Sequence, residues 1–145
     1  MFVNRRTVRI EWGDCDPAGI VYYPRYFAMF DHSTAMLLEV ATGLTKYQMT
    51  KHYDFVGFPM IDTGAKFMIP SKFGDDIVIE TTISELGKSS FTISHKVWKG
   101  DALAIEAHEK RVWVGPHPDD PAKIKSKPIP DEVANKLRGK TTVDV

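Results

Sequence analysis

The chain has 145 residues, which is the length of one ordinary domain with a single core. Hydrophobic residues make up 43% of the chain and charged residues 26%, a composition typical of folded globular proteins that excludes intrinsic disorder. Nineteen Lys and Arg residues balance nineteen Asp and Glu residues, so the chain lacks the positive field by which proteins attract nucleic acid. We expect no nucleic acid partner.

The sequence also argues against membrane, disulfide and metal chemistry. No stretch is apolar for the roughly 18 residues that a membrane span needs, so we expect a cytoplasmic protein with no membrane partner. Cys15 is the only cysteine, which precludes an internal disulfide and a thiolate metal cluster. The pair His108-Glu109 lacks a second histidine one helical turn later and lies in a predicted strand, so we expect no metal and no cofactor.

A strand, a shaped loop and a long helix are predicted in the first third of the chain. Residues 5–12 alternate polar and apolar side chains, which predicts a half-buried strand carrying Val8, Ile10 and Trp12 on one face. Two glycines and a proline in residues 13–19 forbid regular structure and predict a loop. Pro24 suits the first position of a helix.

The predicted helix is about eighteen residues long and ends at Gly43, which favours the left-handed conformation that stops helices. Its apolar face is indicated by side chains that recur every three or four residues. These are Phe27, Phe30, Thr34, Leu37, Leu38 and Ala41.

The remainder of the chain predicts a sheet. After a polar connector over residues 46–54, strands are expected at 55–69, 76–86, 90–98 and 103–115. Short turns between them make neighbouring strands antiparallel, which gives an α+β protein whose sheet packs on the single long helix. We interpret residues 1–145 as a single domain in which 116–145 form a surface C-terminal extension with a short helix at 131–137.

Asp16 is the candidate for chemistry in the loop. It precedes Pro17, so its backbone is extended, and its carboxylate is held just upstream of the helix N-terminus, where free N–H groups gather. A purely structural alternative is that the loop carboxylates accept backbone N–H groups and build a turn. Cys15 as a nucleophile is less favoured, because the sequence places no histidine beside it.

The segment Arg9–Pro24, which reads RIEWGDCDPAGIVYYP, resembles the active-site signature of the 4-hydroxybenzoyl-CoA thioesterase family, a branch of the hot-dog-fold thioesterases. The resemblance extends to Tyr26 and Phe30-Asp31, continues at Pro70 and at Gly74-Asp75, and covers roughly residues 5–115. It implies a five-stranded antiparallel sheet wrapped around one long helix. It also implies subunits that pair edge to edge, with active sites at the interface.

The resemblance implies catalytic roles for two residues. Asp16 acts as nucleophile or as general base on a thioester carbonyl, and the main-chain N–H of Tyr23 holds the carbonyl oxygen. Attack by the carboxylate gives a mixed anhydride, whereas a base activates water directly, and the residues do not choose between these routes. In both routes a helix N-terminus stabilises the charge that grows on the oxygen.

The resemblance also implies substrate contacts. Asp31 can meet the ring hydroxyl of an aryl substrate, or it is a solvated helix residue or a partner of Arg25 or His32. Lys88, Ser89 and Ser90 are the candidates for binding the nucleotide end of CoA, although Lys88 can equally be an ordinary turn lysine.

The sequence thus favours an acyl-CoA thioesterase acting on an aryl- or acyl-CoA ester, with a 4-hydroxybenzoyl-CoA-like substrate preferred. Free CoA and carrier-protein thioesters both remain open. The alternatives are a non-catalytic acyl-CoA-binding regulatory domain and a hot-dog dehydratase, although no histidine lies near the helix start where such dehydratases carry one. An open sheet edge predicts a homo-oligomer, either a dimer or a tetramer.

Overall fold

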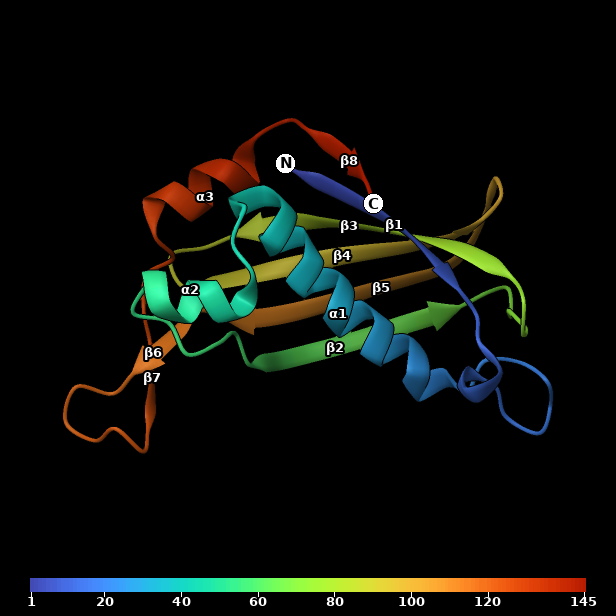
Figure 1. The fold of residues 1–145 in the computed structure, drawn as a ribbon, viewed down its shortest axis with the longest axis horizontal. Helices are drawn as coiled ribbons and strands as arrows, with labels where there is room; N and C mark the ends of the chain where they lie inside the picture. Colours follow the sequence, from blue (N-terminus) through green and yellow to red (C-terminus); the bar gives the residue numbers. More distant parts are fainter.

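The protein is a six-stranded sheet that curves around one long helix (Figure 1). The computed structural model describes all 145 residues. The strands of this sheet are β1 (Val3–Arg9), β2 (Met60–Phe67), β3 (Asp76–Leu86), β4 (Ser90–Lys99), β5 (Ala102–Val112) and β8 (Thr142–Asp144). Their order is β2-β5-β4-β3-β1-β8, and all neighbours are antiparallel except β1 and β8. The predicted α+β plan is therefore confirmed.

The remaining elements lie at the ends of the sheet or cover its inner face. They are η1 (Trp12–Asp14), α1 (Tyr23–Thr42), α2 (Lys46–His52), β6 (Val114–Pro116), β7 (Ile124–Ser126) and α3 (Asp131–Arg138). Helix α1 crosses the sheet diagonally (Figure 1). Pro24 occupies its second position rather than its first, and Gly43 ends it with a φ of 76°, as predicted.

The strand predicted at 55–69 is shorter, because β2 covers only Met60–Phe67. Two other local predictions were wrong, each because side chains capped a turn. The first strand ends at Arg9, and Trp12 lies in η1 with 77% of its surface exposed, because the N–H of Glu11 bonds the carboxylate of Asp14. The connector after α1 forms helix α2, since Thr45 and Gln48 make a reciprocal capping box.

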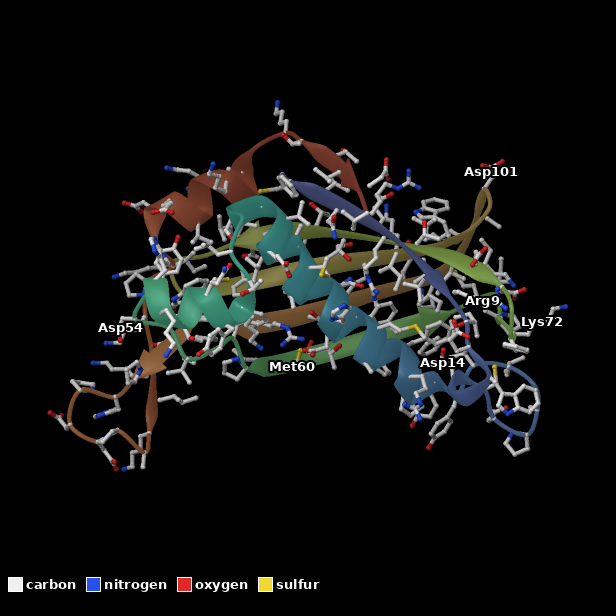
Figure 2. All side chains as sticks on the ribbon, in the orientation of Figure 1. Arg9, Asp14, Asp54, Met60, Lys72 and Asp101 are labelled. Carbon is white, nitrogen blue, oxygen red and sulfur yellow. The ribbon has the colours of Figure 1, made fainter.

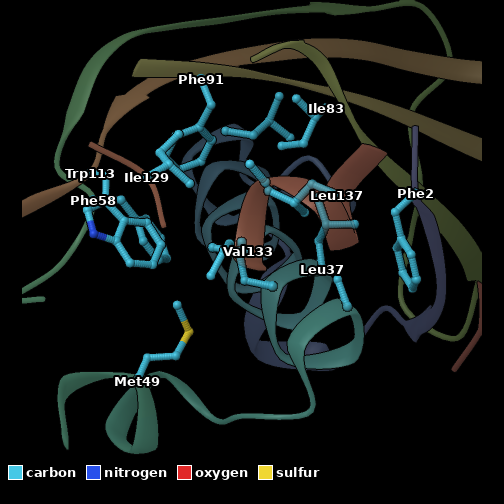
Figure 3. Packing of buried hydrophobic residues seen from close by; sticks show 14 of the residues in the cluster. Phe2, Leu37, Met49, Phe58, Ile83, Phe91, Trp113, Ile129, Val133 and Leu137 are labelled. Carbon is cyan, nitrogen blue, oxygen red and sulfur yellow. The ribbon is translucent and has the colours of Figure 1, made fainter. Parts of the chain in front are cut away.

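The C-terminal tail differs most from its prediction. Residues 116–145 supply a sixth strand, β8, in addition to the predicted helix. Helix α3 buries Val133 and Leu137 against Leu37 of α1 and Phe91 of β4 (Figure 3). Residues 129–137 of the tail are thus part of the core rather than a surface extension, because their apolar residues recur at helical spacing and cover the open end of the sheet. Residues 116–128, which include β7, are largely exposed, as a surface extension would be.

A row of polar side chains divides the core into two hydrophobic clusters. One cluster surrounds the C-terminal half of α1 and includes α3, and the other surrounds its N-terminal half. The polar row comes from α1 and from three adjacent strands, and every member is at most 4% exposed. Its members are Thr34, Thr81, His95, Glu109 and Arg111.

The edge strand β2 exposes three large apolar side chains. It pairs only with β5, which leaves its outer N–H and C=O groups without a strand partner. Met60, Ile61 and Phe67 expose 40%, 59% and 44% of their surface. Natural sheets usually protect such an edge from pairing with another chain. No helix of the protein has the length and apolar composition needed to cross a membrane.

Candidate active site

The loop between β1 and α1 closes on itself and presents Asp16. Cys15 pairs with Val21 in an isolated antiparallel bridge, and the N–H of Asp16 donates to the carbonyl of Ile20 at 2.9 Å. Gly19 turns the chain with a φ of 83°, a conformation that a side chain would strain. The loop is therefore a fixed element at one end of the sheet, near the labelled residues Arg9 and Asp14 (Figure 2).

Asp16 uses one carboxylate oxygen for the loop and leaves the other free. Its Oδ1 accepts the N–H of Ala18 at 2.9 Å, the turn bond that the structural alternative predicted. No protein group bonds Oδ2, and the side chain is half-buried. The carboxylate of the neighbouring Asp14 accepts the N–H of Glu11 at 2.9 Å, so Asp14 stabilises the structure of the loop. A free oxygen on a fixed carboxylate is what nucleophilic or base chemistry requires.

The N-terminus of α1 begins directly beside this loop. The N–H of Tyr22 donates to the carbonyl of Asp14 at 2.8 Å, which ties the start of the helix to the residues around Asp16. The N–H of Tyr23, the first residue of α1, donates to no backbone carbonyl. An unpaired N–H at the positive end of a helix dipole attracts an oxygen that carries negative charge.

Two clefts meet at Asp16. One has a volume of about 410 Å³ and is walled by Trp12 and Phe73, whose rings stand edge to face at 5.7 Å. The other has a volume of about 340 Å³ and is walled by Tyr22 and Arg25. Neither cleft is lined by a histidine. Asp16 is therefore the group in these clefts that can act as nucleophile or base, apart from the thiol of Cys15.

Aromatic side chains continue the site along α1. Tyr23, Phe27 and Phe67 pack edge to face, with ring centroids 6.2 to 6.4 Å apart. Phe58 does not belong to this group, because it is 3% exposed and packs against Phe55 in the core. The aromatic strip of Tyr23, Phe27 and Phe67 thus lies between the start of α1 and the middle of the helix.

Asp31 follows Phe27 by one turn on the same side of α1 and is bound by Arg111. Its Oδ1 accepts Nη2 of Arg111 at 2.7 Å, so neither Arg25 nor His32 is its partner. The side chain of Asp31 is 61% exposed, whereas that of Arg111 is 5% exposed. This pair connects the polar row in the core to the surface of the helix.

Glu109 is the centre of the buried polar row. It accepts Nε and Nη2 of Arg111 at 3.1 and 3.0 Å, and Thr34 also donates to it. Burial acts to raise the pKa of Glu109, but hydrogen bonds from His95, Arg111 and Thr34 outweigh it and lower that pKa to about 2. Burial acts to lower the pKa of Arg111, yet Glu109 and Asp31 hold it above its usual value. Both groups are therefore charged at neutral pH.

The predicted CoA-binding turn lies far from Asp16 within one chain. Lys88 and Ser89 lie in the β3–β4 turn and Ser90 begins β4, at the end of the sheet opposite the Asp16 loop (Figure 1). Strand β3 has eleven residues, so the two ends are roughly 30 Å apart at about 3.3 Å per residue. Lys88 is exposed, and the carbonyls of Lys88 and Ser89 fix the turn to Ile129 and Trp113 at 2.8 Å. A common site for this turn and Asp16 requires a second subunit.

His95, Glu109 and Arg111 were not recognised from the sequence. A signal was present, because Glu109 and Arg111 occur in phase with the buried residues Ile105 and Ala107 of β5, and His95 occupies a buried position of β4. His108 and Glu109, considered above as a metal pair, point to opposite faces of the strand: His108 is exposed and bonds Asp62.

The sheet wrapped around α1, with a carboxylate loop at the helix start, defines a hot-dog-fold protein of the thioesterase type. The chain belongs to the thioesterase-like superfamily, whose family model matches residues 10–137. It is 36% identical over 111 residues to the 4-hydroxybenzoyl-CoA thioesterase of Pseudomonas sp. (strain CBS-3), which covers 72% of this chain and 78% of that protein.

Solved structures agree with this assignment. A structure of the Pseudomonas 4-hydroxybenzoyl CoA thioesterase matches with a TM-score of 0.81 and 30% identity, covering 92% of this chain and 98% of that one. An aspartate-to-asparagine variant of a 4-hydroxybenzoyl CoA thioesterase, complexed with 4-hydroxybenzoyl CoA, matches with a TM-score of 0.82 and 28% identity over 93% and 98% of the two chains. A gentisyl-coenzyme A thioesterase matches with a TM-score of 0.77 and 30% identity over 93% and 99%.

Proposed function

We propose that this chain hydrolyses aryl-CoA thioesters with Asp16 as the catalytic carboxylate. The observation that carries this proposal is the free Oδ2 of Asp16 in a loop tied to the α1 N-terminus, where the N–H of Tyr23 is unpaired. The family and its named relatives support the reaction class. A thiol-release assay across aryl, short-chain and long-chain CoA esters tests it, and release from none of them would overturn it.

In the proposed reaction Tyr23 N–H binds the thioester carbonyl oxygen and stabilises the negative charge that develops there. In one route an oxygen of Asp16 bonds the carbonyl carbon, the carbon–sulfur bond breaks, and CoA leaves as the thiolate. Water then cleaves the mixed anhydride to give the carboxylic acid and restore Asp16. In the other route Asp16 removes a proton from water, which attacks the carbonyl carbon directly.

The acyl group is proposed to lie along the aromatic strip of Tyr23, Phe27 and Phe67, with its far end at Asp31. Eight residues separate Tyr23 from Asp31, or about 12 Å of helix at 1.5 Å per residue, and both lie on one side of α1. The relatives named for 4-hydroxybenzoyl and gentisyl esters support an aromatic acyl group. A ring hydroxyl that reaches Asp31 would find Oδ2 available, since only Oδ1 is bound by Arg111.

The CoA nucleotide is proposed to bind Lys88, Ser89 and Ser90 of another subunit, because these residues are too far from Asp16 in the same chain. We also propose the cytoplasm as the compartment, where CoA esters are processed and where a single free cysteine, Cys15, is not at risk of oxidative pairing. A non-catalytic acyl-CoA-binding domain is less favoured, since it has no need of the free carboxylate of Asp16.

The protein is expected to be a tetramer built from two dimers. Pairing of β2 with the β2 of a second copy would satisfy the open edge and cover Met60, Ile61 and Phe67. Light scattering measures the mass directly. A monomeric mass at low micromolar concentration, with full activity retained, would show that each chain carries a complete site and would contradict this prediction.

Activity is expected to persist in Cys15→Ser and after exhaustive chelation. The thiol of Cys15 makes one hydrogen bond, to the carbonyl of Glu11 at 3.8 Å, and no histidine lines its clefts to activate it. Substitution is a sharper test than alkylation, because a bulky adduct on Cys15 would fill the clefts beside Asp16. Loss of most of the thioesterase rate in either experiment would contradict a carboxylate mechanism that needs neither thiolate nor metal.

A further inference from the structure

The buried polar row ends at the helix surface in a carboxylate with one free oxygen. Nη2 of Arg111 bonds both Glu109, at 3.0 Å, and Asp31, at 2.7 Å. Nε of Arg111 bonds Glu109 at 3.1 Å, and Nη1 bonds the carbonyl of Phe58 at 3.1 Å. All three nitrogens of the guanidinium are therefore engaged, which fixes its plane as well as its position.

Glu109 is itself held from the opposite side. Thr34 donates to its Oε1, and Nε2 of His95 lies 3.4 Å from the same oxygen. The other nitrogen of His95, Nδ1, lies 2.9 Å from Oγ1 of Thr81. Each residue of the buried polar row is at most 4% exposed, so the row forms a rigid hydrogen-bonded network that runs from β3 to Arg111.

Burying such a polar network costs desolvation free energy, and hydrophobic residues at the same positions would not incur this cost. Its members lie between two hydrophobic clusters, where apolar side chains would pack as well. Arg111 connects this row to one group that reaches solvent, the carboxylate of Asp31, which is 61% exposed. An exposed carboxylate on a flexible side chain gains little from an ion pair, so stability does not explain why Asp31 is held so firmly.

We propose that Arg111 is a positioning residue that, anchored on buried Glu109, fixes the carboxylate of Asp31 with Oδ1 bound and Oδ2 free to accept a hydroxyl of the acyl group. This inference rests on the proposed function, because it assigns how the far end of the acyl pocket is built. Lysine at position 111 keeps the positive charge but has no planar fork, so it cannot hold Glu109 and Asp31 in one fixed geometry.

The test measures discrimination rather than rate alone. The ratio of kcat/KM for 4-hydroxybenzoyl-CoA to that for benzoyl-CoA is determined for the wild type, Arg111→Lys, Asp31→Asn and the double variant. We expect each single variant to lower this ratio about tenfold or more, as loss of a hydrogen bond to a charged group does. We expect the double variant to show a ratio no lower than that of Asp31→Asn, because Arg111 acts through Asp31.

A matched control and a second variant complete the design. Arg5→Lys makes the same chemical change on β1, where Arg5 lies 3.6 Å from Glu80 on another part of the sheet, and it should leave the ratio unchanged. If Arg111→Lys does not fold, Glu109→Gln weakens the anchor of Arg111 while preserving its shape, and it should lower the ratio in the same direction.

Three results would overturn the inference. A merely structural Arg111 would lower kcat/KM for both esters equally and leave the ratio unchanged. If Arg111 and Asp31 act independently, the effects of Arg111→Lys and Asp31→Asn on the ratio would multiply in the double variant. A wild-type ratio of the two kcat/KM values near one would show that Asp31 does not bind the ring hydroxyl. Failure of the wild type to hydrolyse either ester would instead refute the proposed function, and the inference with it.

Discussion

Asp16→Asn is expected to remain folded and to lower kcat by at least about a hundredfold. The substitution removes the charge that serves as nucleophile or base, and such groups contribute roughly 100- to 10,000-fold to rate. In the wild type the N–H of Ala18 lies 2.9 Å from Oδ1 of Asp16. The amide oxygen of asparagine can still accept this N–H, so the loop should keep its conformation. Steady-state thiol release measures the rate, and circular dichroism with a thermal melt verifies the fold.

Asp14→Asn is the matched control for this experiment. It makes the same chemical change two residues away, where the carboxylate accepts the N–H of Glu11 and lines neither cleft. Its rate should fall far less than that of Asp16→Asn. If Asp16→Asn keeps most of the thioesterase rate, Asp16 is not the catalyst. If it unfolds, the carboxylate is chiefly a structural part of the turn.

Arg111→Met is expected to lower the free energy of unfolding by about 3 to 5 kcal/mol. The substitution removes the only guanidinium partner of Glu109, which is 1% exposed, and breaking a buried ion pair from one side strands the other charge. The loss is therefore larger than the usual effect of a single substitution. Urea unfolding followed by tryptophan fluorescence, to which the buried Trp113 contributes, measures it at neutral pH.

The double variant Glu109→Gln with Arg111→Met separates this cause from simple loss of packing. It removes the stranded charge together with its partner, so the double variant should recover part of the stability that Arg111→Met loses. Equal losses in the single and double variants would show that the cost lies in packing against Phe58, over whose ring the guanidinium lies at 5.4 Å. A loss below about 1 kcal/mol would mean that Glu109 becomes protonated or hydrated at little cost.

Local patterns were sufficient to predict most elements. The bounds of β3 match their prediction, because alternation along residues 76–86 is uninterrupted and turn residues flank it on both sides. The end of α1 at Gly43 was predictable, since a left-handed cap is a local preference of glycine. Helix α2 was missed although its capping signal, Thr45 with Gln48, is also local. Its seven residues are too few to show a clear apolar period.

The fold class and the catalytic candidates were thus available from the sequence, because Asp16, its proline and the helix start are neighbours along the chain. Tertiary structure alone decided the rest. It placed the tail in the core through Val133 and Leu137, and it put Lys88 at the opposite end of the sheet from Asp16. It also joined Asp31 of α1 to Arg111 and Glu109 of β5, residues about 80 positions apart. Such contacts depend on how strands align and on which face of a helix meets them, and local preferences do not specify either.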